Sequence, residues 1–382
     1  MKIGIFTEAY TPIVSGVVTS TRLLLSELRR RGHDVRLYTP RHPAHLIDEP
    51  WVSRFPSICF PVRSWIPITV PYSKRLLREI REAGFDVFHT QQPFIMGRLA
   101  RYLARESGAP LVCTIHTQYE HYVHYVAPTA HRAAKAAARY LVRSFCNTCD
   151  IVTTPAKGME KLLRSYGVTK PIHVIPNGID LEPYKHADGT AVRTKLGIPN
   201  DAVMFSFVGR LAKEKNLPVV LRAVSLLKTE APKIVLVLIG DGPERPSLQQ
   251  MAQTLGVAEH VIFVGRVPHI ETPAYHTASD AFVMPSVTEV NPYAVIEALA
   301  GGTPAVAADS FGMREILTDN QDALLVPPEP EAFAEAMRCL AKDENLRHSM
   351  SEAARAKAQQ YSIQRCAERF LEIYADALGK LG

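Results

Sequence analysis

Short apolar runs alternate with amphipathic stretches along the first half of the chain. The runs lie at residues 2–7, 34–40, 86–91, 110–117, 150–156 and 172–178. Runs of this length, bounded by turn-forming residues, are typical of buried strands. The stretches between them repeat their apolar positions at helical spacing, and they predict helices at about Thr19–Arg31, Ser73–Ala83 and Thr129–Phe145.

The second half repeats this alternation. Its apolar runs lie at 203–210, 234–242, 261–267, 281–286 and 304–309, and the helices predicted between them are Leu217–Leu227, Glu244–Leu255, Thr272–Thr277 and Ala294–Ala300. Strands that alternate with helices form parallel sheets, because each helix carries the chain back across the sheet. We therefore predict an α/β fold with two Rossmann-like domains, each a parallel sheet flanked by helices.

A length of 382 residues also fits two domains. Residues Asn177–Ala191 are rich in turn formers, so we place the link between the domains there. We expect a first domain over 1–178 and a second over 179–361. The last stretch, about 362–382, has a helical pattern, and we expect this helix to pack back on the first domain.

Composition excludes several classes of protein. Hydrophobic residues make up 47% of the chain, which is enough for two cores and too much for a disordered protein. No apolar run is long enough to cross a bilayer, and the first residues lack the pattern of a signal peptide. The 6 cysteines are too sparse for a disulfide scaffold. We therefore expect a cytoplasmic protein with free thiols.

The charge is divided unevenly between the halves. Residues 1–190 hold 25 Lys and Arg against 15 Asp and Glu, a balance of +10, whereas residues 191–382 hold 19 against 23, a balance of −4. A basic first half indicates an anionic partner, and the charge alone fits nucleic acid, an anionic membrane or a charged small molecule. A solvated basic surface without a partner is the plain alternative.

Two carboxylates and two cations carry the candidate chemistry. Glu289 lies in a predicted loop before the helix at Ala294–Ala300, and Glu297 lies inside that helix. Carboxylates accept hydrogen bonds from the paired hydroxyls of sugars and ribose, whereas Arg210 and Lys215 suit a diphosphate. The free N–H groups at a helix start favour an anion or a hydroxyl oxygen. Together these features predict a pocket for a sugar nucleotide.

Motifs for other ligands are weak or missing in the sequence. The loop after the first strand contains Gly16 alone instead of the G-x-G-x-x-G of dinucleotide-binding enzymes, and no P-loop motif is present. Cys146 and Cys149 form a lone C-x-x-C, which we interpret as two buried cysteines at a helix end. A zinc site is disfavoured, because no carboxylate or cysteine is convincingly placed to complete a ligand set with the histidines at positions 116, 121, 124 and 131.

Several motifs resemble those of the retaining glycosyltransferases of family 4, over nearly the whole chain. They are the Gly16 loop, TIHT around His116, IPNGID in the linker, GRLAKEKN with Arg210 and Lys215, LIGDGPE, and the two glutamates followed by GGTPAV. The family has a two-Rossmann-domain architecture called B, so the resemblance implies two domains facing across a cleft that holds the nucleotide. That location agrees with the rule that ligands lie beyond the carboxyl ends of parallel strands.

The resemblance implies a role for each matched residue. Arg210 and Lys215 would hold the donor diphosphate. Glu297 would bind the ribose hydroxyls, and Glu289 the hydroxyls of the transferred sugar. His116 would lie at the anomeric centre, near the sugar C6 hydroxyl. The remaining donor contacts would come from Gly16, Asn291, Pro292 and Tyr293, and the acceptor side of the cleft from Tyr10, Tyr119 and His124.

The implied reaction retains the anomeric configuration by a front-face route, in which the leaving phosphate takes the acceptor proton. It needs no metal and no cofactor, because the two cations neutralise the departing nucleotide. Many members carry Phe-Gly after the first glutamate, whereas this chain has TEVNP. That form is similar to bacterial enzymes that glycosylate diacylglycerol, as are TEAYTPIVSGVVTS and HTQYEHYVHYV. The resemblance thus implies transfer of a hexose, expected to be glucose, from a UDP-sugar to 1,2-diacylglycerol.

A lipid acceptor gives the basic first half a partner. We expect it to bind the anionic inner face of the cell membrane peripherally, and not nucleic acid, since no nucleic-acid module is recognisable. The cations expected there are Arg29, Arg30, Arg31, Lys74, Arg75, Arg78, Arg81, Arg98, Arg101 and Arg105. The apolar side chains between them are Trp65, Ile66, Ile68, Val70, Tyr72, Phe94, Ile95 and Met96.

Alternatives stay open at this point. The acceptor could instead be phosphatidylinositol, a sugar or a small soluble molecule. In another class, the chain would be a non-catalytic protein that binds a nucleotide sugar. The sequence does not decide which hexose or which nucleotide the donor carries, nor the oligomeric state.

Overall fold

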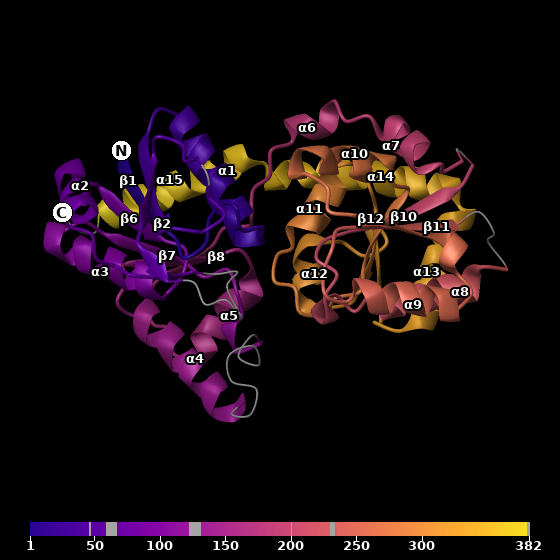
Figure 1. Cartoon of the computed structure of the whole chain (residues 1–382), viewed down its shortest axis with the longest axis horizontal. Helices are drawn as coiled ribbons and strands as arrows, with labels where there is room; N and C mark the ends of the chain where they lie inside the picture. The colour runs from indigo at the N-terminus through magenta and orange to yellow at the C-terminus, as the bar shows by residue number, and fades with distance from the viewer. Residues whose placement is uncertain (46, 59–66, 122–130, 200, 230–233, 380–382) are drawn as a thin grey trace. The chain divides into compact units, whose positions relative to one another are not determined.

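The computed structural model of the chain describes residues 1–45, 47–58, 67–121, 131–199, 201–229 and 234–379 (Figure 1). The chain divides into two compact units. The first is Met1–Gly178 together with Ile363–Gly382, and the second is Ile179–Ser362. The chain therefore passes between the units twice, after Gly178 and after Ser362.

The first unit is built on a parallel sheet of seven strands in the order β3-β2-β1-β6-β7-β8-β9. These strands are β1 (Lys2–Phe6), β2 (Asp34–Pro40), β3 (Val52–Phe55), β6 (Val87–Thr90), β7 (Leu111–Thr114), β8 (Ile151–Thr154) and β9 (Ile172–Val174). A two-stranded antiparallel ribbon joins β4 (Ser57–Ile58) to β5 (Ile68–Thr69). The helices are α1 (Gly16–Arg30), α2 (Lys74–Ala83), α3 (Ile95–Ser107), α4 (His131–Cys146), α5 (Lys157–Ser165) and α15 (Ile363–Gly379).

The two faces of this sheet are covered differently. On one face α1 and α15 pack together over buried aliphatic side chains such as Ile5, Leu28 and Leu37. A separate stack of aromatic rings lies around Phe6, whose ring centroid is 5.0 Å from that of Tyr38 and 5.8 Å from that of Phe88. The helix that ends the chain thus supplies part of the first unit's core.

The first helix ends as its sequence predicts but begins earlier. Ser15 is the N-cap of α1, and its hydroxyl accepts the N–H of Val18, so the helix starts at Gly16, three residues before the predicted Thr19. Gly32 follows the last turn with φ +85°, a left-handed conformation that glycine adopts without strain. Gly16 is thus the first residue of α1, the helix that follows β1, and β1 is an interior strand of the sheet.

The second unit is built on a parallel sheet of six strands in the order β12-β11-β10-β13-β14-β15. They are β10 (Val203–Val208), β11 (Ile234–Ile239), β12 (Val261–Gly265), β13 (Ala281–Met284), β14 (Ala305–Ala308) and β15 (Ala323–Val326). The helices are α6 (Glu182–Lys185), α7 (Gly189–Leu196), α8 (Pro218–Leu227), α9 (Arg245–Thr254), α10 (Thr272–Ala278), α11 (Tyr293–Ala300), α12 (Phe311–Ile316), α13 (Pro330–Lys342) and α14 (Glu344–Ala358). Within this unit, α8 packs on α13 and α11 packs on α14 (Figure 1).

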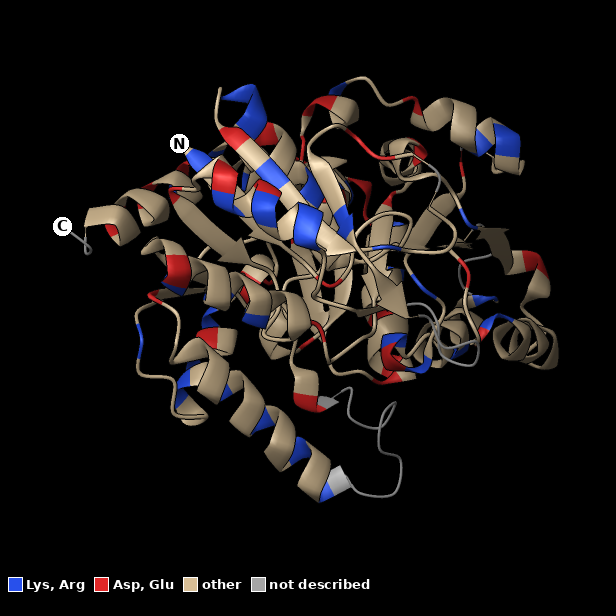
Figure 2. Ribbon diagram, turned by 60° about the vertical axis from the view of Figure 1, so that its left-hand side comes forward, with Lys and Arg blue, Asp and Glu red and all other residues tan. Residues whose placement is uncertain are grey.

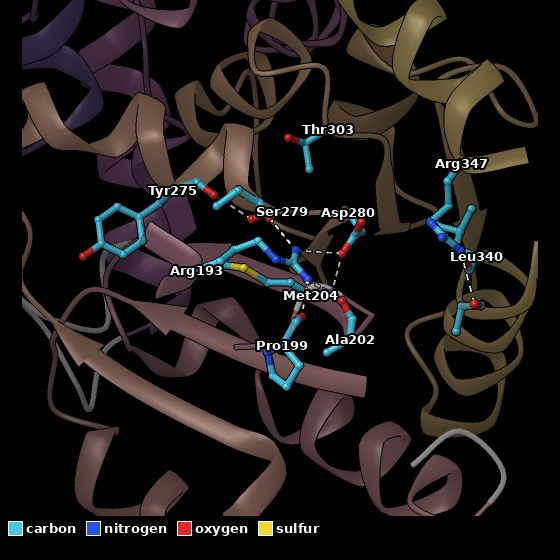
Figure 3. A network of polar contacts seen from close by, with 12 residues as sticks. Arg193, Pro199, Ala202, Met204, Tyr275, Ser279, Asp280, Thr303, Leu340 and Arg347 are labelled. Atoms are coloured by element: carbon cyan, nitrogen blue, oxygen red, sulfur yellow. Dashed lines mark hydrogen bonds and ion pairs between the residues drawn. The ribbon is translucent and has the colours of Figure 1, made fainter. Parts of the chain in front are cut away.

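A largely covered arginine, Arg193, fastens α7 to the amino-terminal ends of two strands. The guanidinium of Arg193 donates to the carbonyl oxygen of Ala278 at 2.9 Å, to Asp280 at 3.1 Å and to the carbonyl of Ala202 (Figure 3). The same Asp280 carboxylate accepts the N–H of Met204 at 2.7 Å. This network lies at the starts of β10 and β13, so it holds the sheet together at the end away from the loops described next.

The predicted alternation of strands and helices is confirmed in both units, and the structure adds elements that were not predicted, among them α5, α7, α12 and β15. The turn-rich linker contains α6, the proline-rich stretch from 42 to 71 contains β3, β4 and β5, and two helices, α13 and α14, follow β15. None of the helices in the described ranges has the length and hydropathy that a bilayer span requires.

Candidate active site

The candidate residues of the second unit follow the carboxyl ends of its parallel strands. Arg210 is exposed just after β10, and Glu289 lies in the loop between β13 and α11. His269 follows β12 in a short 3-10 helix, His269–Glu271. Parallel strands present all their carboxyl ends at one edge, and loops at that edge form ligand sites in α/β proteins.

Lys215 and Glu289 are in direct contact. The Nζ atom of Lys215 donates to Oε1 of Glu289 at 2.5 Å, and the two side chains are 20% and 17% exposed. Lys215 ends the 3-10 helix Lys213–Lys215, and the hydroxyl of Ser286 donates to the carbonyl of Glu214 at 2.8 Å. The loop that carries the carboxylate is therefore tied to the loop that carries the cation.

Two glycines make this arrangement possible, because a side chain at either position would collide with backbone. A Cβ on Gly312, in the first turn of α12, would lie 2.0 Å from the carbonyl oxygen of Glu289. A Cβ on Gly240, which has φ +135°, would lie 1.9 Å from the carbonyl oxygen of Gly209. These close approaches hold the backbone before Arg210 and the backbone of Glu289 against neighbouring loops.

Helix α11 starts at Tyr293, with Pro292 as its N-cap. Proline offers no side-chain acceptor, so Pro292 makes no side-chain capping bond to the first turn. The positive end of the helix dipole is therefore available to an anion or a hydroxyl oxygen. Asn291 is 7% exposed directly before this helix start. The prediction that Glu289 precedes the helix and Glu297 lies inside it is confirmed.

Glu297 is 5% exposed and is held by histidine. Its Oε1 atom accepts a hydrogen bond from Nε2 of His269 at 2.9 Å, and Nε2 of His276 lies 3.8 Å from Oε2. Burial by itself would raise the pKa of Glu297, but the hydrogen bond from His269 and the nearby His276 outweigh it and lower the pKa to about 2. Glu297 is thus a carboxylate at neutral pH, ready to accept hydrogen bonds.

The two histidines were not predicted from the sequence. His276 is fully buried in α10, and its two ring nitrogens have no hydrogen-bond partner among the described residues. His269 is half exposed at the end of the loop after β12. A signal existed, since HIETPAYH places one histidine after a predicted strand and the other in a predicted helix.

In the first unit, His116 directly follows the carboxyl end of β7. Its Nε2 atom lies 2.8 Å from Oε1 of Gln91. Burial lowers the pKa of His116 to about 4, so the imidazole is neutral at physiological pH. Gly16 begins α1 after β1, at the same edge of the sheet. A neutral imidazole can donate one hydrogen bond and accept another but adds no charge.

A buried carboxylate that sequence reasoning did not single out lies next to this edge. Glu8 is 8% exposed, and its Oε1 accepts the N–H of Met96 in the first turn of α3 at 2.6 Å. Thr69 donates to the other oxygen at 3.2 Å. Burial raises the pKa of Glu8, against the effect of these hydrogen bonds. Met96, expected on a membrane-facing surface, is itself fully buried.

The three residues expected on the acceptor side lie in different environments. The Tyr10 side chain is 2% exposed and belongs to the core, where burial raises its pKa to about 12. Tyr119 packs its ring edge-on against Phe94, with 5.0 Å between centroids. His124 lies outside the described residues. Acceptor contacts of these residues stay a prediction.

The cysteine interpretation is confirmed, with an addition. Cys146 and Cys149 are fully buried at the end of α4, and Cys113 of β7, also fully buried, belongs to the same cluster of thiols. In the described ranges no group of three or more His, Cys, Asp or Glu is arranged to hold a metal ion.

Comparison with known proteins shows that glycosyltransferase family models match both halves of the chain. Residues 14–183 match the family model described as Glycosyltransferase Family 4, and residues 188–357 match the one described as Glycosyl transferases group 1. Among curated proteins, the chain is 33% identical to the alpha-monoglucosyldiacylglycerol synthase of Streptococcus pneumoniae, over 99% of the chain and 86% of that relative. It is 28% identical to the enzyme of the same name from Acholeplasma laidlawii, over 100% and 98%.

Solved structures share the fold at lower identity. Sucrose-phosphate synthase from Thermosynechococcus elongatus superposes with a TM-score of 0.79 at 19% identity, covering 100% of both chains. Anabaena HepE in complex with UDP superposes with a TM-score of 0.77 at 18% identity, covering 98% of this chain and 100% of that one. The paired Rossmann-like units are thus those of the glycosyltransferase B fold. With a relative above 30% identity along almost its whole length, this chain belongs to glycosyltransferase family 4.

Proposed function

We propose that this chain transfers a hexose, expected to be glucose, from a UDP-sugar to 1,2-diacylglycerol, with retention of the anomeric configuration. The observation that carries this proposal is the 33% identity to a protein named alpha-monoglucosyldiacylglycerol synthase, which extends over 99% of the chain. UDP as the nucleotide is supported by the fold, which the chain shares with Anabaena HepE solved with UDP and with UDP-glucose.

The geometry of the second unit supports donor binding there. Lys215 and Arg210 would neutralise the diphosphate, and the uncapped start of α11 with Asn291, Pro292 and Tyr293 would bind phosphate or sugar oxygens. The carboxylate of Glu297, oriented by His269, would accept the ribose hydroxyls. A diphosphate would compete with Glu289 for Lys215, and a displaced Glu289 carboxylate would be free to accept hydroxyls of the sugar.

The chemistry would need no added base. The leaving phosphate would take the proton of the acceptor hydroxyl, while Gly16 and His116 of the first unit contribute backbone contacts and orientation. We also propose that no metal ion and no cofactor takes part, because the two cations supply the counter-charge to the departing nucleotide.

The proposed location is the cytoplasmic face of the membrane. Several cations predicted to face it are already engaged within the first unit. Arg30 and Arg31 bond to Glu27, and Arg81 bonds to Glu106. Arg29 stacks on the ring of Trp51 at 4.2 Å. Trp65 and Ile66 lie outside the described residues.

Helix α4 offers a better candidate for the anionic contact. A groove of about 540 Å³ between α4 and α5 is lined by Arg132, Lys135, Arg139 and Arg143. Arg139 is paired with Glu120 of the 3-10 helix Tyr119–His121, so the other three cations carry the candidate contact. Figure 2 shows the cations spaced along α4. Tyr140 stands in the same groove with 70% of its side chain exposed. Basic side chains next to an exposed tyrosine suit the headgroup region of an anionic bilayer, where each cation adds about 1 kcal/mol.

A transfer screen tests the enzymatic proposal. Purified protein is incubated with UDP-glucose, UDP-galactose, GDP-mannose and UDP-N-acetylglucosamine, each with and without diacylglycerol in anionic vesicles. Lipid-dependent nucleotide release with a glycolipid product supports the proposal and names the sugar. Release with GDP-mannose alone would favour the chemistry named for a Mycobacterium tuberculosis relative, a GDP-mannose-dependent alpha-mannosyltransferase 30% identical over 86% of this chain and 84% of that relative. Binding without release with any donor would favour a non-catalytic protein.

Vesicle binding tests the membrane surface separately. The double variant Arg132→Glu and Lys135→Glu should lose binding to anionic vesicles at low salt. The control, Lys195→Glu with Arg222→Glu, makes the same change in net charge on exposed positions of the second unit. An equal loss of vesicle binding in both double variants would mean that total charge, rather than the α4 groove, drives binding.

A further inference from the structure

A buried chain of polar side chains runs from the last helix of the first unit to His116. Tyr374 of α15 lies 2.7 Å from Nδ1 of His89, which is in β6. The side-chain amide nitrogen of Gln91 lies 3.3 Å from Nε2 of His89, and its oxygen lies 2.8 Å from Nε2 of His116. His89 and Tyr374 are fully buried and Gln91 is 1% exposed, so water does not compete for the bonds among these three, whereas His116 is partly exposed.

The orientation of Gln91 determines where the hydrogen of His116 resides. The amide oxygen of Gln91 faces Nε2 of His116 and can only accept, so this nitrogen carries the hydrogen. Burial lowers the pKa of His116 to about 4, and a neutral imidazole has only one N–H. The Nδ1 atom of His116 is therefore an acceptor, and it has no partner among the described residues.

The other end of the chain keeps Gln91 in this orientation. The neutral ring of His89 has one unprotonated nitrogen, and the amide nitrogen of Gln91 lies 3.3 Å from Nε2 and 3.5 Å from Nδ1, so it can donate to whichever of the two accepts. The hydroxyls of Tyr374, 2.7 Å from Nδ1, and of Thr114, 2.7 Å from Nε2, can each donate or accept, so they complete the hydrogen bonding of the ring. Burial lowers the pKa of His89 to about 3, which keeps this ring neutral as well. With its oxygen on His116 and its nitrogen on His89, Gln91 has a hydrogen-bond partner at both ends of its amide.

We propose that Gln91 is a positioning residue that fixes His116 in the tautomer with hydrogen on Nε2, leaving Nδ1 to accept a hydrogen bond from a hydroxyl of the transferred sugar. His89 and Tyr374 hold Gln91 in the orientation that achieves this. The inference rests on the proposed function in one respect, namely that His116 faces the transferred sugar. The tautomer itself does not depend on the reaction.

Nitrogen NMR tests the tautomer directly. In histidine-labelled protein at neutral pH, two-bond proton–nitrogen correlations distinguish a protonated from an unprotonated ring nitrogen. The His116 signals are assigned by their loss in His116→Asn. The expected spectrum shows hydrogen on Nε2 only. A spectrum with hydrogen on Nδ1, or with both tautomers exchanging, overturns the proposal.

Variants of Gln91 separate positioning from simple packing. Gln91→Leu removes the acceptor and should give a mixture of tautomers, whereas Gln91→Glu retains an acceptor oxygen and should retain hydrogen on Nε2. An unchanged His116 spectrum in Gln91→Leu overturns the role of Gln91. If Gln91→Leu fails to fold, the spectra of the wild type and of Gln91→Glu still test whether His116 carries its hydrogen on Nε2.

The far end of the chain has a matched control. Tyr374→Phe removes the hydroxyl that orients His89, and it should shift the His116 signals toward a mixture. Tyr38→Phe removes another buried tyrosine hydroxyl of the first unit, one that contacts Glu79 at 3.4 Å, and it should leave the spectrum unchanged. Equal spectra for the two variants overturn the part assigned to His89 and Tyr374.

Kinetics distinguish a failure of this inference from a failure of the proposed function. In Gln91→Leu, kcat/KM for UDP-glucose should fall about tenfold, the worth of one hydrogen bond, whereas that for UDP-xylose, which lacks the C6 hydroxymethyl group, should not. An equal fall for both donors overturns the assigned acceptor role. If the tautomer behaves as expected but His116→Asn transfers sugar at the wild-type rate, the proposed place of His116 is wrong while its orientation by Gln91 stands.

Discussion

Lys215 and Glu289, which the sequence assigns to a diphosphate and to a sugar, are bonded to each other across 2.5 Å. Each neutralises the other, and both are mostly buried. A donor that binds to Lys215 must exchange one anion for another. The loop of Glu289 is therefore expected to respond to the diphosphate before it responds to the sugar.

Removal of the cation should affect chemistry more than folding. In Lys215→Ala we expect turnover to fall about 10²–10³-fold, because the departing nucleotide loses its counter-charge. Steady-state transfer with saturating donor measures this. Lys213→Ala is a matched control, since Lys213 is an exposed lysine of the same 3-10 helix. Wild-type turnover in Lys215→Ala would exclude the diphosphate role.

Glu297 should make stability depend on pH in the acid range. Its pKa falls from 4.5 to about 2 in the folded protein, so the folded state favours the carboxylate by about 3 kcal/mol. This contribution is complete above the unfolded pKa and is lost as the pH falls through about 2. Urea unfolding of Glu297→Gln and wild type should differ most near neutral pH and converge in acid.

The control for this measurement is Glu331→Gln, an exposed glutamate in the first turn of α13. Its difference from the wild type should be small at every pH. A difference between Glu297→Gln and the wild type that stays constant down to acid pH would mean that packing, not charge, is lost in the variant.

Chelation should leave transfer intact. If Arg210 and Lys215 supply the counter-charge, activity after treatment with excess EDTA and exchange into metal-free buffer should stay within about twofold of the untreated enzyme. Restoration of a lost activity by added Mg²⁺ or Mn²⁺ would contradict the metal-independent mechanism.

Arg193 should matter for stability and not for the chemistry. Arg193→Met leaves Asp280 and several backbone carbonyls without their donor, so we expect a loss of about 3 kcal/mol. For a unit of this size, that lowers the melting temperature by about 6–12 °C. Arg222→Met, at an exposed position of α8, should change the melting temperature little. Below its melting temperature, Arg193→Met should retain wild-type turnover.

Strong local patterns account for the parts of the fold that the sequence predicts well. The bounds of α8 and α11 are confirmed to within a residue, because Pro218 and Pro292 mark the helix starts. Helix α14 has its buried positions at Met350, Ala354 and Ala358, and alanine contrasts weakly with the charged residues around it. In the sequence, a helix whose buried positions are mostly alanine is hard to distinguish from a polar segment.

The candidate site is likewise predictable only where its features are encoded by residues close together in the sequence. The spacing of the two glutamates predicts their positions relative to α11, because a helix start is encoded locally. The partners of those residues are not encoded locally. Glu297 meets His269 from a segment 28 residues away, and His89 meets Tyr374 from 285 residues away. Only the folded chain shows that a tyrosine near the end of the sequence contacts the strand before Gln91.

The return of α15 to the first unit has a consequence for how the protein is made. A ribosome delivers residues in order, so the sheet of the first unit emerges long before the helix that covers its face. During that interval the surface destined for Phe370 and Tyr374 stays open to solvent, and His89 has no tyrosine partner. The second unit, Ile179–Ser362, is synthesised in between and has its own core. The unit that begins the chain is therefore completed only after the second unit has been synthesised, and a chain cut short before α15 would have one finished unit.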